Sequence, residues 1–212
     1  MKILSHRGYW KTSEEKNTTL AFERSFSLGF GTETDVRDLA GDLVISHDMP
    51  RAGVLSASEL FEIHTRKGPS LELALNIKSD GLQIPLLSLL KKFDVQNYFL
   101  FDMAIPDALT CLRHGLKCFT RQSEYERDPV FYPQAEGVWI DGFHSEWWDE
   151  TLIQRHLNMG KKVCIVSPDL HRRPHLPCWD NLAGWSICSH PALMLCTDLP
   201  EDAAELFQSS LP

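Results

Sequence analysis

The sequence predicts a single-domain α/β fold, a (β/α)8 TIM barrel that is compact and has no large insertion. Strand-like and helix-like runs alternate along all 212 residues, and polar residues stand where apolar strands end. Strands that alternate with helices run parallel, and right-handed crossovers then allow the sheet to close into a barrel. The hydrophobic content of 43% is enough for one substantial core, and no polar linker divides the chain. We therefore expect residues 1–212 to form one domain.

Three strand-like runs in the first quarter of the chain contain or precede histidines and acidic residues that could take part in catalysis or metal binding. They are 2–4 before His6, 31–36 around Glu33 and Asp35, and 43–45 before His47. Enzymes of the α/β class concentrate their chemistry at strand ends, so these residues are the first candidates for a site. Side chains alternate along a strand, so Glu33 and Asp35 point to the same face, and two acids on one face suit a hard cation.

Helices are expected between most of the strands. Ser56 or Ser58 can cap one of them, and Pro85 and Pro106 stand at the start of two others. The expected helices are 18–28, 57–65, 85–93, 106–114, 146–159 and 174–185. The remaining expected strands are 71–78, 98–103, 117–121, 138–141, 162–166 and 194–197. The chain is short for a barrel, so its loops must be lean.

Composition narrows the partners and the location. A net charge of −8 with dispersed basic residues argues against nucleic acid as a partner. No apolar run approaches the roughly 20 residues of a transmembrane segment. The first strand starts directly after Met1 with no signal peptide, and the six cysteines contain no CxxC pair. We therefore expect a reduced, cytoplasmic protein, and the sequence does not indicate its oligomeric state.

Short motifs extend over nearly the whole chain. They are His6-Arg7-Gly8, Asn17-Thr18, Ala21-Phe22, Gly29, Glu33-x-Asp35-Val36, His47-Asp48, Asn76-Ile77-Lys78 and Thr197-Asp198-Leu199-Pro200. Together they resemble the glycerophosphodiester phosphodiesterase family, whose barrels are similar to phosphatidylinositol-specific phospholipase C. The family usually has a glutamate metal ligand where this chain has Asn76. Many members also carry a long insertion after the second histidine, which is largely missing here.

The resemblance implies a phosphodiesterase with histidine acid–base catalysis, of the kind found in lipid metabolism. His6 would take a proton from a substrate hydroxyl and His47 would protonate the leaving oxygen. Arg7 and Lys78 would bind the phosphate. A divalent cation, Mg²⁺ or Ca²⁺, would be the cofactor, because zinc would usually recruit histidine or cysteine. The expected metal ligands are Glu33, Asp35, Asn76 and Asp102. Since Asn76 brings no charge, Asp102, Glu124 and Asp141 are the candidate substitutes for the missing carboxylate.

Each role has a structural alternative. The two strand carboxylates could pair with Arg37, which shares their face, and Arg7 or Lys78 could neutralise them without binding substrate. Asp102 and Asp141 could be loop caps. Weaker candidates for binding an anionic substrate are Arg121 and the pair Arg172-Arg173. The tryptophans of the second half could be core or could cover a substrate; they are Trp139, Trp147, Trp148, Trp179 and Trp185.

Two functions of different classes remain. The first is cleavage of a small-molecule or polymer phosphodiester that has a hydroxyl adjacent to the phosphate, with water opening a cyclic phosphate. If the second step is lost, the same site is a cyclising lyase. The second function is binding of phosphodiesters without turnover by a degenerate barrel, a reading motivated by Asn76. The presence of both His6 and His47 favours the enzyme.

Overall fold

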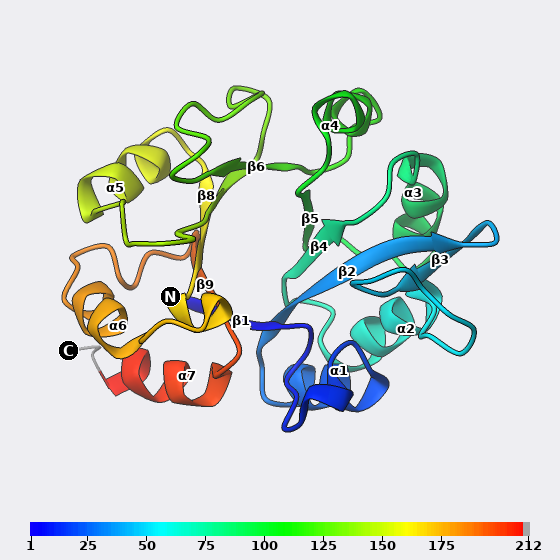
Figure 1. Ribbon diagram of the computed structural model, residues 1–212, viewed down its shortest axis with the longest axis horizontal. Helices are drawn as coiled ribbons and strands as arrows, with labels where there is room; N and C mark the ends of the chain where they lie inside the picture. Colours follow the sequence, from blue (N-terminus) through cyan, green and yellow to red (C-terminus); the bar gives the residue numbers. More distant parts are fainter. Residues whose placement is uncertain (210–212) are drawn as a thin grey trace. The chain divides into compact units, whose positions relative to one another are not determined.

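Strand β1 (Lys2–His6) contributes residues to both of the compact units that the chain forms. The computed structural model describes residues 1–209 (Figure 1). Residues 5–118 form the N-terminal unit, and residues 1–4 together with the chain from residue 119 onward form the C-terminal unit. The predicted alternation of strands and helices continues through both units.

The sheet of the N-terminal unit has the order β5-β4-β2-β1. Its parallel strands are β2 (Gly31–Leu39), β4 (Leu73–Ile77) and β5 (Tyr98–Phe101). The run predicted at 43–45 is β3 (Asp42–Ile45), which pairs antiparallel with β2 and lies outside the parallel series. The two strands are joined by Ala40 and Gly41, with φ of 52° and 95°, as a two-residue hairpin turn requires.

The helices of the N-terminal unit begin at recognisable caps. The Thr18 side chain accepts a hydrogen bond from Ala21 N at the start of α1, and Ser56 and Glu59 form a capping box at the start of α2. Helix α1 packs on β2 and α2 packs on β3, and the two helices contact each other (Figure 1). The helical elements are η1 (Ser13–Glu15), α1 (Thr19–Ser27), α2 (Ala57–Lys67), α3 (Gln83–Lys92) and α4 (Ile105–Arg113).

The sheet of the C-terminal unit has the order β1-β9-β8-β7-β6, and its strands β6 to β9 are parallel. The strands are β6 (Phe119–Gln122), β7 (Gly137–Ile140), β8 (Lys162–Val166) and β9 (Leu193–Thr197). The helical elements are α5 (Glu150–Asn158), η2 (Pro168–His171), α6 (Leu176–Ala183) and α7 (Pro200–Ser209). Four tryptophans of this unit are buried, as expected for core residues, and they are Trp139, Trp148, Trp179 and Trp185.

The elements differ from the predictions mainly at their ends. The helix predicted at 85–93 starts two residues earlier, at Gln83, so that Pro85 lies inside its first turn, where a missing N–H costs no hydrogen bond. The helix predicted at 146–159 starts only at Glu150, because Asp149 caps it and accepts from Leu152 N. Helix α7 was not predicted, although Pro200 at its start is a recognisable signal.

Two further features concern the cysteines and the length of the helices. All six cysteines are buried and none forms a disulfide. Among residues 1–209, no helix combines the length and the apolar character needed to cross a bilayer.

Candidate active site

Neighbouring strands bring three polar residues to one edge of the sheet in the N-terminal unit. The β2–β4 register pairs Asp35 with Asn76, and the β4–β5 register pairs Asn76 with Phe101. Asp102 is the next residue after Phe101, so it follows β5 at the level where Asn76 stands on β4. Glu33 lies two residues before Asp35 and is buried with it, at 2% and 1% exposure.

The end of β1 and the loop after it place His6 and Arg7 beside the carboxylates. Arg7 N donates to the Glu33 backbone oxygen at 2.8 Å, which ties the loop to β2. Gly8 has φ of +78°, and a Cβ atom there would lie 2.8 Å from the Ala21 Cβ, so the position requires glycine. The His6-Arg7-Gly8 motif therefore depends on close packing against α1.

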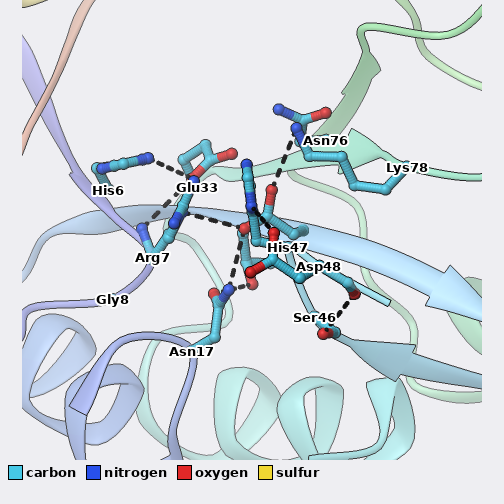
Figure 2. A network of polar contacts seen from close by, with 12 residues as sticks. His6, Arg7, Gly8, Asn17, Glu33, Ser46, His47, Asp48, Asn76 and Lys78 are labelled. Carbon is cyan, nitrogen blue, oxygen red and sulfur yellow. Dashed lines mark hydrogen bonds and ion pairs between the residues drawn. The ribbon is translucent and has the colours of Figure 1, made fainter. Parts of the chain in front are cut away.

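The two buried carboxylates lie close to an arginine, a lysine and a histidine side chain. Arg7 Nε lies 3.2 Å from Asp35 Oδ2, Lys78 Nζ lies 3.4 Å from Asp35 Oδ1, and His6 Nε2 lies 3.8 Å from Glu33 Oε2. Figure 2 shows the labelled His6 and Arg7 side chains approaching from one segment and the Lys78 side chain from another. Burial, reinforced by the charge of Asp35, raises the pKa of Glu33 to about 7.

His47 reaches this edge because β3 folds back on β2. Ser46 N donates to the Asp35 backbone oxygen at 3.0 Å, and Arg37 Nε donates to the His47 backbone oxygen at 3.2 Å. Arg37 thus contacts the hairpin that carries His47. The His47 ring is 43% exposed, and its Nδ1 lies 2.8 Å from Asp48 Oδ1.

Asn76 and Asp102 are in contact. Asn76 Nδ2 donates to Asp102 Oδ2 at 3.3 Å, and Asn76 Oδ1 is buried without a hydrogen-bond partner among the described residues. Lys78 follows on the same chain segment, and its backbone N donates to the Val36 oxygen at 3.0 Å, which aligns it with the end of β2.

Three residues of the site have left-handed backbone conformations. Arg7, Asn17 and Asp102 have φ of 59°, 59° and 64°. Such conformations are uncommon for residues other than glycine and persist where the surrounding structure holds them in place. Their concentration around one pair of carboxylates indicates a functional site.

Asn17 and Asp48 were not predicted as site residues, although both belong to the motifs. Asn17 Nδ2 donates to Asp35 Oδ2 at 3.0 Å, and Asn17 Oδ1 accepts from Thr34 Oγ1 at 2.8 Å, so this side chain fixes the Asp35 carboxylate. Asp48 holds the His47 ring through Nδ1. Asp48 directly follows His47, and Asn17 belongs to the Asn17-Thr18 motif, so membership in these motifs is the signal that could have identified them.

The weaker candidates and other polar residues have structural partners. Glu124 accepts hydrogen bonds from the backbone N–H groups of residues 143, 144 and 145, and Asp141 Oδ1 lies 2.7 Å from His171 Nε2. Arg121 pairs with Glu126. Among the remaining histidines, buried His64 contacts the Leu71 oxygen. These contacts account for each side chain as part of a loop or packing arrangement.

The oxygen atoms of the acidic and amide side chains on β2 and β4 are suitable ligands for a hard cation. Two buried oxygens, Asp35 Oδ1 and Asn76 Oδ1, have no hydrogen-bond partner among the described residues, and Glu33 adds a second carboxylate. Carboxylate and amide oxygens are the ligands that Mg²⁺ and Ca²⁺ prefer. No group of three or more His, Cys, Asp or Glu residues within 1–209 is arranged to hold a metal, so an amide oxygen would have to complete the set.

The fold is that of a (β/α)8 barrel, and the candidate site lies at the ends of its strands. The chain is similar to a glycerophosphodiester phosphodiesterase from Agrobacterium tumefaciens, with 14% identity, a TM-score of 0.74 and coverage of 99% of both chains. It is also similar to a phosphodiesterase from Oleispira antarctica in complex with the product sn-glycerol-3-phosphate, with 16% identity, a TM-score of 0.66 and coverage of 99% of this chain and 96% of the other.

A third similar structure is a Ca²⁺-dependent phosphatidylinositol-specific phospholipase C from Streptomyces antibioticus, with 10% identity, a TM-score of 0.56 and coverage of 97% and 95%. No protein-family model matches the chain, and no curated protein matches it in sequence. At these identities the likeness establishes the fold. The predicted TIM barrel is confirmed, and the resemblance read from the motifs is confirmed at the level of the fold.

Proposed function

We propose that this protein is a phosphoric diester hydrolase that cleaves a glycerophosphodiester or a related glycerol or sugar phosphodiester with the help of a divalent cation. One observation carries the proposal: two buried carboxylates, Glu33 and Asp35, lie at a strand edge within 4 Å of His6, Arg7 and Lys78. Burying two carboxylates beside each other is unfavourable unless positive charges compensate them. The same arrangement could bind a metal cation at the carboxylates and a phosphate at the basic side chains.

His6 and His47 would divide the proton transfers. His6 would accept a proton from the substrate hydroxyl that attacks phosphorus, and His47 would donate one to the departing oxygen. The contact between His47 Nδ1 and Asp48 leaves Nε2 as the nitrogen available for that donation. A water molecule would then open the cyclic phosphate, and an enzyme that omits this step would be a cyclising lyase.

Arg7 and Lys78 would exchange their contacts with Asp35 for the non-bridging oxygens of the phosphate. The side chains proposed to hold Mg²⁺ or Ca²⁺ are Glu33, Asp35 and Asn76, with Asp102 in contact with Asn76. When bound, the cation would stabilise negative charge on the phosphate oxygens. The product found in the Oleispira antarctica phosphodiesterase supports a glycerol phosphodiester as the substrate class. Six buried cysteines without a disulfide support a reducing, cytoplasmic location.

The test is ³¹P NMR of glycerophosphodiesters and glycosyl phosphodiesters with added Mg²⁺ or Ca²⁺, which detects turnover and any cyclic product together. We expect His6→Ala and His47→Ala each to reduce kcat by about 10² to 10⁴. Chelation by EDTA should abolish turnover, and Asp35→Asn should raise the cation concentration required. His114→Ala, on an exposed histidine that follows α4, is the matched control and should keep full activity.

The alternative is a barrel that binds phosphodiesters without turnover, which the neutral Asn76 favours. In that case the phosphorus resonances would shift or broaden on binding while no new product resonance appeared. Full turnover in EDTA would contradict the cation assignment, and wild-type rates in either histidine variant would remove that residue from the mechanism.

A further inference from the structure

Asn76 has a buried side-chain amide in which only one of the two polar atoms has a hydrogen-bond partner among the described residues. It stands on β4 between Asp35 of β2 and Phe101 of β5 and is 7% exposed. Its Nδ2 donates to Asp102 Oδ2 at 3.3 Å, whereas its Oδ1 has no hydrogen-bond partner among the described residues. Buried acceptors without a partner are uncommon, so the oxygen calls for a ligand.

Asp102 determines which atom of the Asn76 side-chain amide lacks a hydrogen-bond partner. A carboxylate only accepts hydrogen bonds, so it selects the orientation in which the Asn76 NH₂ group faces it. The reverse orientation would bring the amide oxygen against a carboxylate oxygen, where two acceptors repel. Asp102 has φ of +64°, immediately after β5, so its side chain is presented from an uncommon backbone conformation.

We propose that Asp102 is a positioning residue that turns the Asn76 carbonyl oxygen toward the cation, and that the two residues together replace one carboxylate ligand. Asn76 supplies the oxygen, and Asp102 supplies the charge behind it. A hydrogen bond from the amide to a carboxylate polarises the amide, which increases the negative charge on Oδ1. No three acids among residues 1–209 form a metal-binding group, which agrees with Asp102 acting through Asn76. The inference rests on the cation of the proposed function.

The test is calorimetric titration of the whole chain with Mg²⁺ and with Ca²⁺. Asp102→Asn and Asp102→Gly both tolerate a left-handed backbone. Asp102→Asn removes the charge and adds a donor, and Asp102→Gly removes the acceptor altogether. Loss of an outer partner of a metal ligand typically weakens binding about 10-fold to 100-fold, and we expect losses in that range. The matched controls are Asp94→Asn and Asp94→Gly, at an exposed aspartate with φ of 49°, which should bind the cations as the wild type does. Melting temperatures in EDTA verify that each variant is folded.

A double-mutant cycle separates positioning from direct ligation. If Asp102 acts through Asn76, then Asp102→Asn should cause no further loss of cation affinity in an Asn76→Ala background. Glu33 and Asp35 remain in that background, so residual binding can still be titrated. Additive losses would identify Asp102 as a ligand in its own right and overturn the inference.

Asp35→Asn distinguishes failure of this inference from failure of the proposed function. If Asp35→Asn loses the cation while both Asp102 variants bind it like the wild type, the inference is wrong and the cation site stands. If the wild type binds neither cation, or if Asp35→Asn binds as tightly as the wild type, both the cation site and the inference built on it are wrong.

Discussion

The two oxygens of Asp35 have different surroundings. Oδ2 accepts from Asn17 Nδ2 at 3.0 Å and lies 3.2 Å from Arg7 Nε, while Oδ1 has Lys78 Nζ at 3.4 Å. Because Asn17 is itself held by Thr34 Oγ1, the carboxylate cannot rotate freely. One oxygen is thereby fixed to the protein, and the other stays available to a ligand.

The raised pKa of Glu33 predicts a pH dependence of stability in the absence of cations. Burial and the charge of Asp35 raise the Glu33 pKa from 4.5 to about 7, so the folded protein favours the protonated form. The contribution of this group to stability is therefore complete below about pH 4.5 and declines as the pH rises toward about 7. Above that pH it should change no further.

The measurement is the melting temperature in EDTA between pH 4.5 and 8, for the wild type and for Glu33→Gln, which stays neutral throughout. We expect the wild type to lose stability relative to the variant by a few kcal/mol across this range. Asp35→Asn should narrow the range, because it removes a charge that raises the Glu33 pKa. Parallel profiles for the wild type and Glu33→Gln would contradict the assignment.

At the residue scale, the sequence predicted the pair of carboxylates but not the contacts that their neighbours make. The period of two along a strand predicted that Glu33 and Asp35 act together, and both are buried at one strand edge. The contact between Asn76 and Asp102 depends on the register between β4 and β5, which a single sequence does not specify. The roles of these residues remain predictions.

At the scale of elements, the loop from β1 to α1 is the most demanding part of the site. Gly8 has φ of +78°, and an added Cβ would lie 2.8 Å from Ala21 Cβ and 2.9 Å from the Ala21 carbonyl carbon. Gly29, after α1, has a similar φ of +82° but nothing within 4 Å of an added Cβ. The two glycines therefore share a backbone conformation and differ in the space around them.

We predict that Gly8→Ala destabilises the protein more than Gly29→Ala does. Both variants bear the cost of a left-handed alanine, about 1–2 kcal/mol. Gly8→Ala should cost a further 1–3 kcal/mol or so, because the backbone of α1 has to move, and it should also reduce activity by displacing Arg7. Urea denaturation measures the difference between the two variants. Equal losses would mean that the contact with Ala21 is not tight.

Element existence was easier to predict than element pairing. Amphipathic and apolar periodicity located nearly every strand and helix, and 162–166 matches β8 residue for residue. The antiparallel pairing of β3 was missed, although Ala40 and Gly41 stand at its turn, because a short apolar run does not reveal its direction. That hairpin is the element that brings His47 beside β2.

At the scale of the whole molecule, the sequence predicts one domain, whereas the contacts gather into two compact units that both include part of β1. We predict that the two units unfold together. A strand divided between two units loses pairing in both when either one unfolds, so an intermediate with only one unit folded should be poorly populated. Whether the two units unfold cooperatively therefore tests the prediction that the chain is one domain.

Tryptophan and cysteine are distributed so that each unit can be followed separately. Five of the six tryptophans belong to the C-terminal unit, and only Trp10 belongs to the N-terminal unit, so fluorescence reports mainly on the former. Cys111 and Cys118 are buried in the N-terminal unit and the other four thiols in the C-terminal unit. We expect pulsed thiol labelling, read by mass spectrometry across a urea gradient, to give one midpoint for both groups of cysteines, coincident with the fluorescence midpoint. Labelling of Cys111 and Cys118 at a distinctly different urea concentration would mean that the units are separate folding domains.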